Sequence, residues 1–216
     1  MLDLLIKGGQ VVTPSGAGDF DVGIEDGRIV LVAERNAIEL EAHRTINAAG
    51  KYVLPGGVEP HTHIATSVSE AWAGRPGVMT QSPEAASRAA AFGGVTTYID
   101  FAGDMPGTET GDQSGNSIMN RLDSRRDIFK GHSYTDFSFH YTLAGEVPAE
   151  TIGEIGEAIQ SGVASFKIFT TFASKVGYGH LWAIFDEVGK QGGIMAVHAE
   201  DDDIVKFMEN KLKREG

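Results

Sequence analysis

Two histidines separated by one residue, His61 and His63, have the spacing in this sequence that most directly suggests chemistry. In an extended strand the side chains at positions i and i+2 point to the same side, so both imidazoles would converge on one point. An apolar run over residues 53–58 precedes them and predicts a buried strand that emerges at His61. An imidazole pair at a strand end is suited to hold a metal ion, although such a pair also arises by chance.

A lysine, Lys167, and a third histidine, His198, strengthen the case for a metal site. Lys167 lies in the apolar run 166–169, where a protonated ammonium would be costly and a neutral amine is favoured. A neutral amine can add carbon dioxide to form a carbamate, an anionic ligand whose two oxygens can bridge two divalent cations. The simpler interpretation is a lysine that reaches the surface or pairs with a carboxylate. His198 favours the metal interpretation because it brings another imidazole to a strand end.

From residue 52 onward, predicted strands alternate with predicted helices. Polar residues stand near the ends of five successive strands, 27 to 40 residues apart, which suits strand-helix units. Among them, His140 is expected to support the site rather than to bind a metal. The strands are expected at residues 53–63, 95–101, 136–143, 163–169 and 194–198, with His61, Asp100, His140, Lys167 and His198 as their polar end residues. Helices are expected at 82–92, within 117–131, and at 148–161, 178–191 and 201–214, the first of them capped by Ser82 and opened by Pro83.

This pattern predicts an α/β fold with two parts. Residues 52–216 are expected to form the first part of a (β/α)8 TIM-type barrel, with about five βα units, and residues 1–51 a small N-terminal β-sandwich segment. A complete barrel takes about 250 residues, so this one is expected to be incomplete at the C-terminus. An open, doubly wound five-stranded sheet is the alternative. An unclosed barrel would expose apolar strand edges and, in isolation, would tend to aggregate without any activity.

The composition narrows the possible partners. The chain has 216 residues and a net charge of -12, which argues against nucleic acid or an anionic membrane, because both are bound by an excess of Lys and Arg. It has no cysteine, so disulfides and thiolate metal sites are excluded. No apolar run approaches the roughly 20 residues of a membrane helix, and the N-terminus lacks a signal-peptide pattern. A cytoplasmic protein is therefore expected.

Four ordered motifs together resemble the N-terminal part of the dihydropyrimidinase/hydantoinase branch of the amidohydrolase superfamily. They are residues 55–63, 93–101, 165–169 and 197–200, and residues 6–12 and 21–29 also resemble the opening strands of that family's β-sandwich. The resemblance implies an enzyme, a metal-dependent hydrolase of cyclic amide C–N bonds that acts through a metal-bridging hydroxide. Its substrate would be a small cyclic amide or ureide, and the full-length protein would form a homo-oligomer, a tetramer.

The same resemblance assigns metal ligands. It implies two divalent ions, zinc or alternatively manganese. His61 and His63 would hold one ion, His198 would hold the other, and a carbamylated Lys167 would bridge both. In such relatives a further His and an Asp that acts as general base complete the site, and both are expected beyond residue 216.

One residue departs from the pattern of the family. Relatives that hydrolyse hydantoins or dihydropyrimidines carry a Tyr five residues after the bridging lysine, and its hydroxyl supports the developing oxyanion. Phe172 occupies that position here and is expected to contact substrate without donating this hydrogen bond. A related amidohydrolase, such as an allantoinase or a dihydroorotase, is therefore an alternative. A non-catalytic scaffold or binding protein of the same fold is another.

Overall fold

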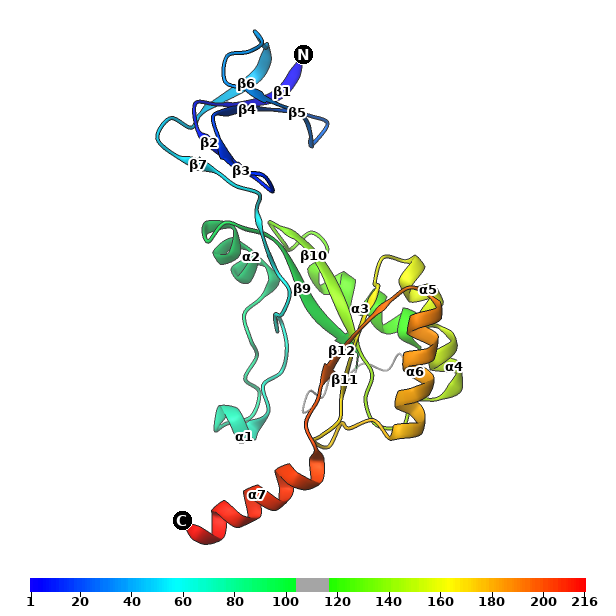
Figure 1. Cartoon of the computed structure of the whole chain (residues 1–216). Helices are drawn as coiled ribbons and strands as arrows, with labels where there is room; N and C mark the ends of the chain where they lie inside the picture. Colours follow the sequence, from blue (N-terminus) through cyan, green and yellow to red (C-terminus); the bar gives the residue numbers. More distant parts are fainter. Residues whose placement is uncertain (104–116) are drawn as a thin grey trace. The chain divides into compact units, whose positions relative to one another are not determined.

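The chain folds as two compact units. The computed structural model describes residues 1–103 and 117–216, without the side chains of residues 71 and 72. The units are Met1–Gly56 and Gly57–Gly216. Figure 1 shows that the first unit consists of strands and that the second combines strands with helices.

The first unit contains seven strands in two sheets. They are β1 (Leu2–Lys7), β2 (Gln10–Thr13), β3 (Gly16–Gly18), β4 (Phe20–Glu25), β5 (Arg28–Glu34), β6 (Ala42–Asn47) and β7 (Tyr52–Val53). One sheet has the order β5-β4-β1-β6 and the other β3-β2-β7. Strands β4 and β5 form a hairpin, and its turn residues Asp26 and Gly27 both have positive φ, 50° and 70°, as a tight hairpin turn requires. The packing of the two sheets into a sandwich stays a prediction.

The second unit is built on a five-stranded sheet in which all neighbouring strands run parallel. The strands are β8 (Gly57–Glu59), β9 (Val95–Gly103), β10 (Asp136–Thr142), β11 (Ser165–Phe169) and β12 (Ile194–His198). Their order is β12-β11-β10-β9-β8, so each strand pairs with its neighbour in sequence. A doubly wound sheet would reverse the strand order at one point, and the described strands show no reversal. The curled parallel sheet in Figure 1 is consistent with part of a barrel.

Seven helices lie between these strands and after the last of them in the described part of the chain. They are α1 (Glu70–Ala73), α2 (Pro83–Phe92), α3 (Ile118–Phe129), α4 (Ala149–Gly153), α5 (Ile155–Gln160), α6 (Tyr178–Lys190) and α7 (Asp202–Glu215). The hydroxyl of Ser82 accepts a hydrogen bond from the N–H of Ala85 (3.3 Å) and caps α2, as predicted. The helix expected over residues 148–161 is instead divided into α4 and α5 at Glu154, next to Gly153, since glycine weakens a helix interior.

One face of the sheet carries the hydrophobic core. Alternate residues of a strand point to opposite faces, and Tyr98, Tyr141 and Phe166 of β9, β10 and β11 share the buried face. Helices α3, α5 and α6 pack against this core with apolar residues such as Leu122 and Ile184. Because helices cover this face, side chains of the sheet that could bind a ligand lie on the opposite face.

The first strand of the sheet is shorter than predicted. β8 ends at Glu59, so the His-x-His pair follows the strand instead of lying in it. The reason is Pro60, which has no N–H to extend the hydrogen-bond ladder of a strand. The backbone nevertheless stays beside β9, because the N–H of Thr62 donates to the carbonyl oxygen of Ile99 (3.3 Å).

Replacing Leu122 with Ala should destabilise the second unit strongly. The side chain is 0% exposed in the core, and removing a buried leucine in this way costs about 2 to 5 kcal/mol. Leu212→Ala is the matched control, because Leu212 in α7 is 61% exposed and its loss should change stability by less than about 0.5 kcal/mol. Urea denaturation measures both free energies of unfolding. Equal losses would contradict this assignment of the core.

Candidate metal site

The sheet places the predicted ligands of β11 and β12 on the face opposite the core. His140 of β10 pairs in register with Ser165 of β11, and Phe169 of β11 pairs with His198 of β12. Residues in register on neighbouring strands share a face, and so do residues two apart in one strand. Lys167 stands two residues from both Ser165 and Phe169. It therefore lies on the same face as both histidines.

His61 and His63 lie on this face as well, packed against the ring of Phe101. Phe101 is in register with His140 and so belongs to the same face. Its ring centroid is 4.7 Å from that of His61 and 5.0 Å from that of His63, on which it stacks. The two imidazoles are 5.1 Å apart, centroid to centroid, with 78° between their planes. The structure thus brings the pair together although it lies beyond the end of β8.

His140 holds the backbone just before the histidine pair. Its Nδ1 lies 2.6 Å from Oγ of Ser165, and its Nε2 lies 2.8 Å from the carbonyl oxygen of Pro60. A carbonyl oxygen only accepts hydrogen bonds, so Nε2 carries a proton, and in a neutral ring Nδ1 accepts from the serine hydroxyl. Both nitrogens of His140 are occupied by these contacts, as suits a supporting residue.

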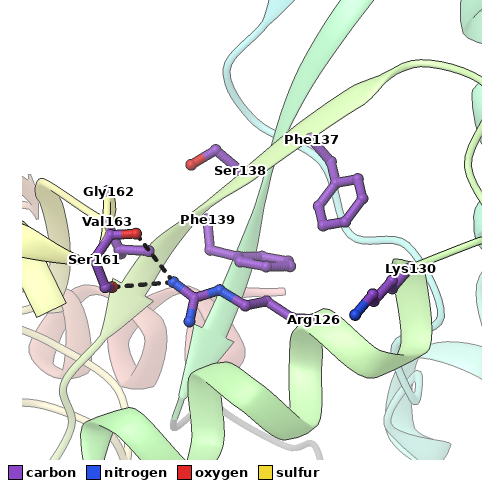
Figure 2. Close-up of a pocket in the computed structure, with 8 residues that line it drawn as sticks. All are labelled: Arg126, Lys130, Phe137, Ser138, Phe139, Ser161, Gly162 and Val163. Atoms are coloured by element: carbon purple, nitrogen blue, oxygen red, sulfur yellow. Dashed lines mark hydrogen bonds between the residues drawn. The ribbon is translucent and has the colours of Figure 1, made fainter.

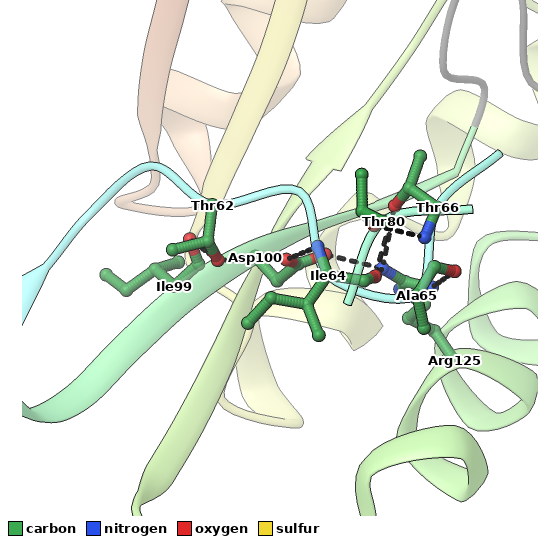
Figure 3. Close-up of polar contacts among 8 residues, drawn as sticks. All are labelled: Thr62, Ile64, Ala65, Thr66, Thr80, Ile99, Asp100 and Arg125. Carbon is green, nitrogen blue, oxygen red and sulfur yellow. Dashed lines mark hydrogen bonds and ion pairs between the residues drawn. The ribbon is translucent and has the colours of Figure 1, made fainter. Parts of the chain in front are cut away.

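A buried carboxylate, that of Asp100, holds the segment around the second histidine (Figure 3). The residue is 0% exposed, and its Oδ2 accepts hydrogen bonds from the hydroxyl of Thr62 and the N–H of Ile64, both at 2.8 Å. Its Oδ1 forms an ion pair with Nη2 of Arg125 at 2.6 Å. Arg125 also donates to the carbonyl oxygens of Ile64 (2.5 Å) and Ala65 (3.2 Å). Carboxylate and guanidinium therefore compensate each other and together fix this segment.

Lys167, His198 and Phe172 form a second group over β11 and β12. Nζ of Lys167 lies 4.8 Å from the centre of the Phe169 ring. The His198 ring lies 5.5 Å from that ring and 5.1 Å from the ring of Phe172. Nε2 of His198 lies 2.7 Å from a carboxylate oxygen of Glu200, which only accepts when ionised. In a neutral His198 ring the proton therefore lies on Nε2, and Nδ1 keeps the lone pair.

Burial favours the neutral form of one base in each group. It lowers the pKa of His63 below its ordinary value, and the neighbouring His61 lowers that pKa further. Burial also lowers the pKa of Lys167, even though the Phe169 ring beside the ammonium favours the charged form. Metal ligation by imidazole and carbamate formation by an amine both require the neutral base. Both shifts are in the direction that the predicted roles need.

These donors suit zinc or a similar divalent ion by type, and the structure holds them as two groups. Imidazole nitrogens are typical zinc ligands. The histidine pair lies beside β9 and Lys167 stands on β11, so the usual strand spacing separates the groups by roughly 10 Å. Among the residues that the structure describes, no three His, Cys, Asp or Glu side chains form a metal-binding cluster. Each group can contribute to one ion, and a bridge between them would come from Lys167.

Phe172 stands on an anchored loop after β11. Its φ of 68° is left-handed, a conformation that bulky residues rarely adopt, and the residue is 48% exposed. Thr171 donates to the carboxylate of Asp202 at the start of α7 (3.1 Å), and Lys175 forms an ion pair with the same carboxylate. Lys206 adds a second ion pair at 2.6 Å. Asp202 thus ties the loop to α7.

A cavity of about 390 Å³ lies in another part of the second unit (Figure 2). Its walls come from the end of α3, the start of β10 and the turn before β11, so it lies at the amino ends of the strands. Arg126 there donates to the hydroxyl and the carbonyl oxygen of Ser161 (3.0 and 3.4 Å). The predicted ligands stand near the carboxyl ends of the strands, and none of them lines this cavity.

Apart from His140, sequence reasoning did not find the residues that support the predicted ligands. Asp100 offered a signal, because a carboxylate inside an apolar strand needs a buried partner. Its partner Arg125 lies 25 residues away in a helix with several other charges, and no pattern singles it out. Glu200 stands two residues after His198, a spacing that could have suggested the contact between them.

Comparison with known protein sequences agrees with the motifs of the chain. The model of an amidohydrolase family matches residues 44–147. A D-hydantoinase of Streptomyces coelicolor is 34% identical over 203 residues, which cover 91% of this chain and 40% of the relative. A D-hydantoinase of Ralstonia pickettii is 31% identical over 100% of this chain and 44% of its own length. The chain therefore spans about two fifths of the length of the curated relatives that it matches.

Solved structures of similar proteins give the same result. One D-hydantoinase structure matches 100% of this chain and 44% of its own, with a TM-score of 0.81 and 29% identity. A dihydropyrimidinase from Brevibacillus agri matches 98% of this chain and 43% of its own, with a TM-score of 0.79 and 25% identity. The sheet described above is thus similar to the corresponding part of these proteins.

Acid should loosen the attachment of the Phe172 loop. Contacts with Lys175 and then Lys206 hold the pKa of the Asp202 carboxyl well below its ordinary value of 3.8. A carboxyl with a depressed pKa stabilises the folded state above its unfolded pKa, and this contribution is lost as the pH falls below about 4. Asp202→Asn removes the contribution, so its free energy of unfolding should depend less on pH than that of the wild type.

Urea denaturation at several pH values between about 6 and 2 measures this dependence. Asp203→Asn is the control, because this neighbouring carboxylate is exposed and forms none of these contacts with the loop. It should follow the wild type. An Asp202→Asn variant with the pH dependence of the wild type would refute the anchoring role.

Proposed function

We propose that this chain, which is related along its length to the hydantoinases and dihydropyrimidinases of the amidohydrolase family, is the metal-binding part of an enzyme that hydrolyses cyclic amides. One observation carries the proposal: the His61/His63 pair, Lys167 and His198 share one face of the sheet. The carboxyl ends of parallel barrel strands are where such folds place their chemistry. The names of the matched hydantoinases support the same activity.

In this proposal the two groups of side chains hold two divalent ions. His61 and His63 would hold one ion, His198 would hold the other through Nδ1, and a carbamylated Lys167 would be the ligand that links the two groups. Glu200 orients the His198 ring through its hydrogen bond to Nε2, as carboxylates commonly do for metal-binding histidines. Bound ions of this kind polarise a substrate carbonyl and lower the pKa of a water molecule.

The Phe172 ring would form an apolar wall of the substrate site beside His198. It offers no hydroxyl, so the hydrogen bond to the developing oxyanion that a tyrosine would donate is missing. The substrate is a small cyclic amide or ureide, with hydantoins and dihydropyrimidines first. Allantoin-like and dihydroorotate-like rings are the alternatives that the absent hydroxyl leaves open.

Several finer features of the proposal follow from the family resemblance. They are zinc in preference to manganese, the carbamate on Lys167, a homotetramer, and a further His and an Asp general base that complete the site. The cytoplasmic location is proposed from the composition, and the division into residues 1–51 and 52–216 from the pattern of strands and helices. In the part of the chain that the structure describes, no helix is both long and apolar enough to span a membrane.

A non-catalytic scaffold is the second candidate function, and Phe172 is the observation that favours it. Loss of an oxyanion donor lowers a rate without affecting the fold. The four predicted ligands favour the enzyme instead, because a scaffold has no need for them.

Lys167→Ala should abolish most activity of the complete gene product loaded with zinc or manganese. The wild type should contain bound divalent metal and turn over at least one of hydantoin, dihydrouracil, allantoin and dihydroorotate. Loss of the bridging ligand should lower both the metal content and kcat/KM, the latter by about 100-fold or more. Elemental analysis and steady-state kinetics measure these, with His132→Ala, an exposed histidine, as the control.

The outcomes separate the two candidate functions. Wild-type protein without bound metal would refute the proposal, and so would a Lys167→Ala variant with unchanged metal content and activity. Protein that binds metal but turns over none of the four substrates would favour the scaffold.

Phe172→Tyr should raise kcat for hydantoin or dihydrouracil, by up to about 100-fold, because one oxyanion donor is generally worth 10²- to 10³-fold in rate. KM should change little, since the ring keeps its size. Phe172→Leu, which also lacks a hydroxyl, is the control and should show no increase. Steady-state kinetics on both variants provide the test. An unchanged kcat in the tyrosine variant would mean that residue 172 stands away from the reacting carbonyl.

A further inference from the structure

We propose that Asp100 is a positioning residue for the metal-binding histidines, and that it acts through Thr62 and the backbone of Ile64. The inference rests on the function proposed above. It gives a role to a buried polar network that lies outside the set of predicted ligands (Figure 3).

Thr62 and Ile64 alternate along the chain with the two histidines. The hydroxyl of Thr62 and the N–H of Ile64 both reach Asp100 at 2.8 Å, while the rings of both histidines pack on Phe101. Successive residues of an extended backbone point to opposite sides. Holding the intervening residues on one side therefore fixes the direction in which the imidazoles leave the backbone on the other.

A single strand supplies both sides of this arrangement. Asp100 and Phe101 are consecutive residues of β9, so they face opposite sides of the sheet. Asp100 holds the backbone of the histidine segment, and Phe101 provides the surface on which the imidazole rings rest. The carbonyl oxygen of Ile99, also in β9, accepts from the N–H of Thr62 (3.3 Å) and adds another point of attachment. The orientation of the imidazoles thus depends on β9.

Arg125 completes the network from α3. Its guanidinium pairs with Asp100, lies 4.9 Å from the centre of the Phe129 ring, and donates to the carbonyl oxygens of Ile64 and Ala65. A buried ion pair adds little net stability compared with apolar residues of the same size. The main effect of this pair is therefore its directional hydrogen bonds. They join it to Thr62, Ile64 and Ala65, in the segment that contains the histidines.

The experiment removes one hydrogen bond and keeps the fold. Asp100→Ala would leave Arg125 buried without its partner and is expected to unfold the unit, so it is unsuited to the test. Thr62→Val replaces the hydroxyl with a methyl group of the same size. Thr62→Ser restores the hydroxyl, and Thr96→Val, at an exposed threonine of β9, is the matched control.

The complete gene product is loaded with Co²⁺, and its visible absorption spectrum and Co²⁺ affinity are measured with the melting temperature. Thr62→Val should melt within a few degrees of the wild type, bind Co²⁺ about 10- to 100-fold more weakly and show an altered spectrum. Thr62→Ser should recover the affinity and spectrum of the wild type, and Thr96→Val should keep both. This recovery distinguishes positioning from a general loss of stability.

The outcomes that overturn the inference are distinct from those that overturn the proposed function. Wild-type protein that binds no Co²⁺ would refute both. Wild-type protein that binds Co²⁺, with a Thr62→Val variant of the same affinity and spectrum, would refute only the positioning role of Asp100. A Thr62→Ser variant as weak as Thr62→Val would refute it too, because the hydroxyl would then not be the group that matters.

Discussion

The alternation of side chains along parallel strands is the constraint on which this structure depends. It separates β9, β10 and β11 into one face that packs against helices and another that carries imidazoles, an amine and aromatic rings. A polar group on the first face has to find a buried partner, as Asp100 does in Arg125. A polar group on the second face can instead contact a ligand. The chemistry of the chain is therefore decided by strand register as much as by residue type.

Partial burial prepares the second face for its proposed role. The aromatic rings of Phe101 and Phe169 support the bases and reduce their contact with water. The lowered pKa values of His63 and Lys167 follow from this desolvation, since a charged base loses more than a neutral base when water is removed. The same packing that orients these groups therefore also favours the protonation state that metal ligation and carbamate formation need.

Much of the second unit could be predicted from the sequence because its signals are local. The Ser82-Pro83 start of α2 and the apolar runs of β9 and β12 are clear in any short window. The shared face of the candidate ligands also follows from the two-residue period with which side chains alternate along a strand. The partner of Asp100 could not be predicted, because it depends on how α3 packs on the sheet. The end of β8 was placed wrongly because the motif reads as one extended run, although Pro60 interrupts its ladder.

The left-handed backbone at Phe172 has a consequence for the evolution of the proposed substrate site. A bulky residue in this conformation costs about 1 to 2 kcal/mol relative to an unstrained one, which glycine would avoid. A glycine there would relax the loop but remove the ring beside His198. If Phe172 lines the substrate site as proposed, one position would determine both substrate specificity and the backbone strain of the loop. A substitution at this position therefore exchanges backbone strain against the aromatic contact with His198, in a loop that Asp202 ties to α7.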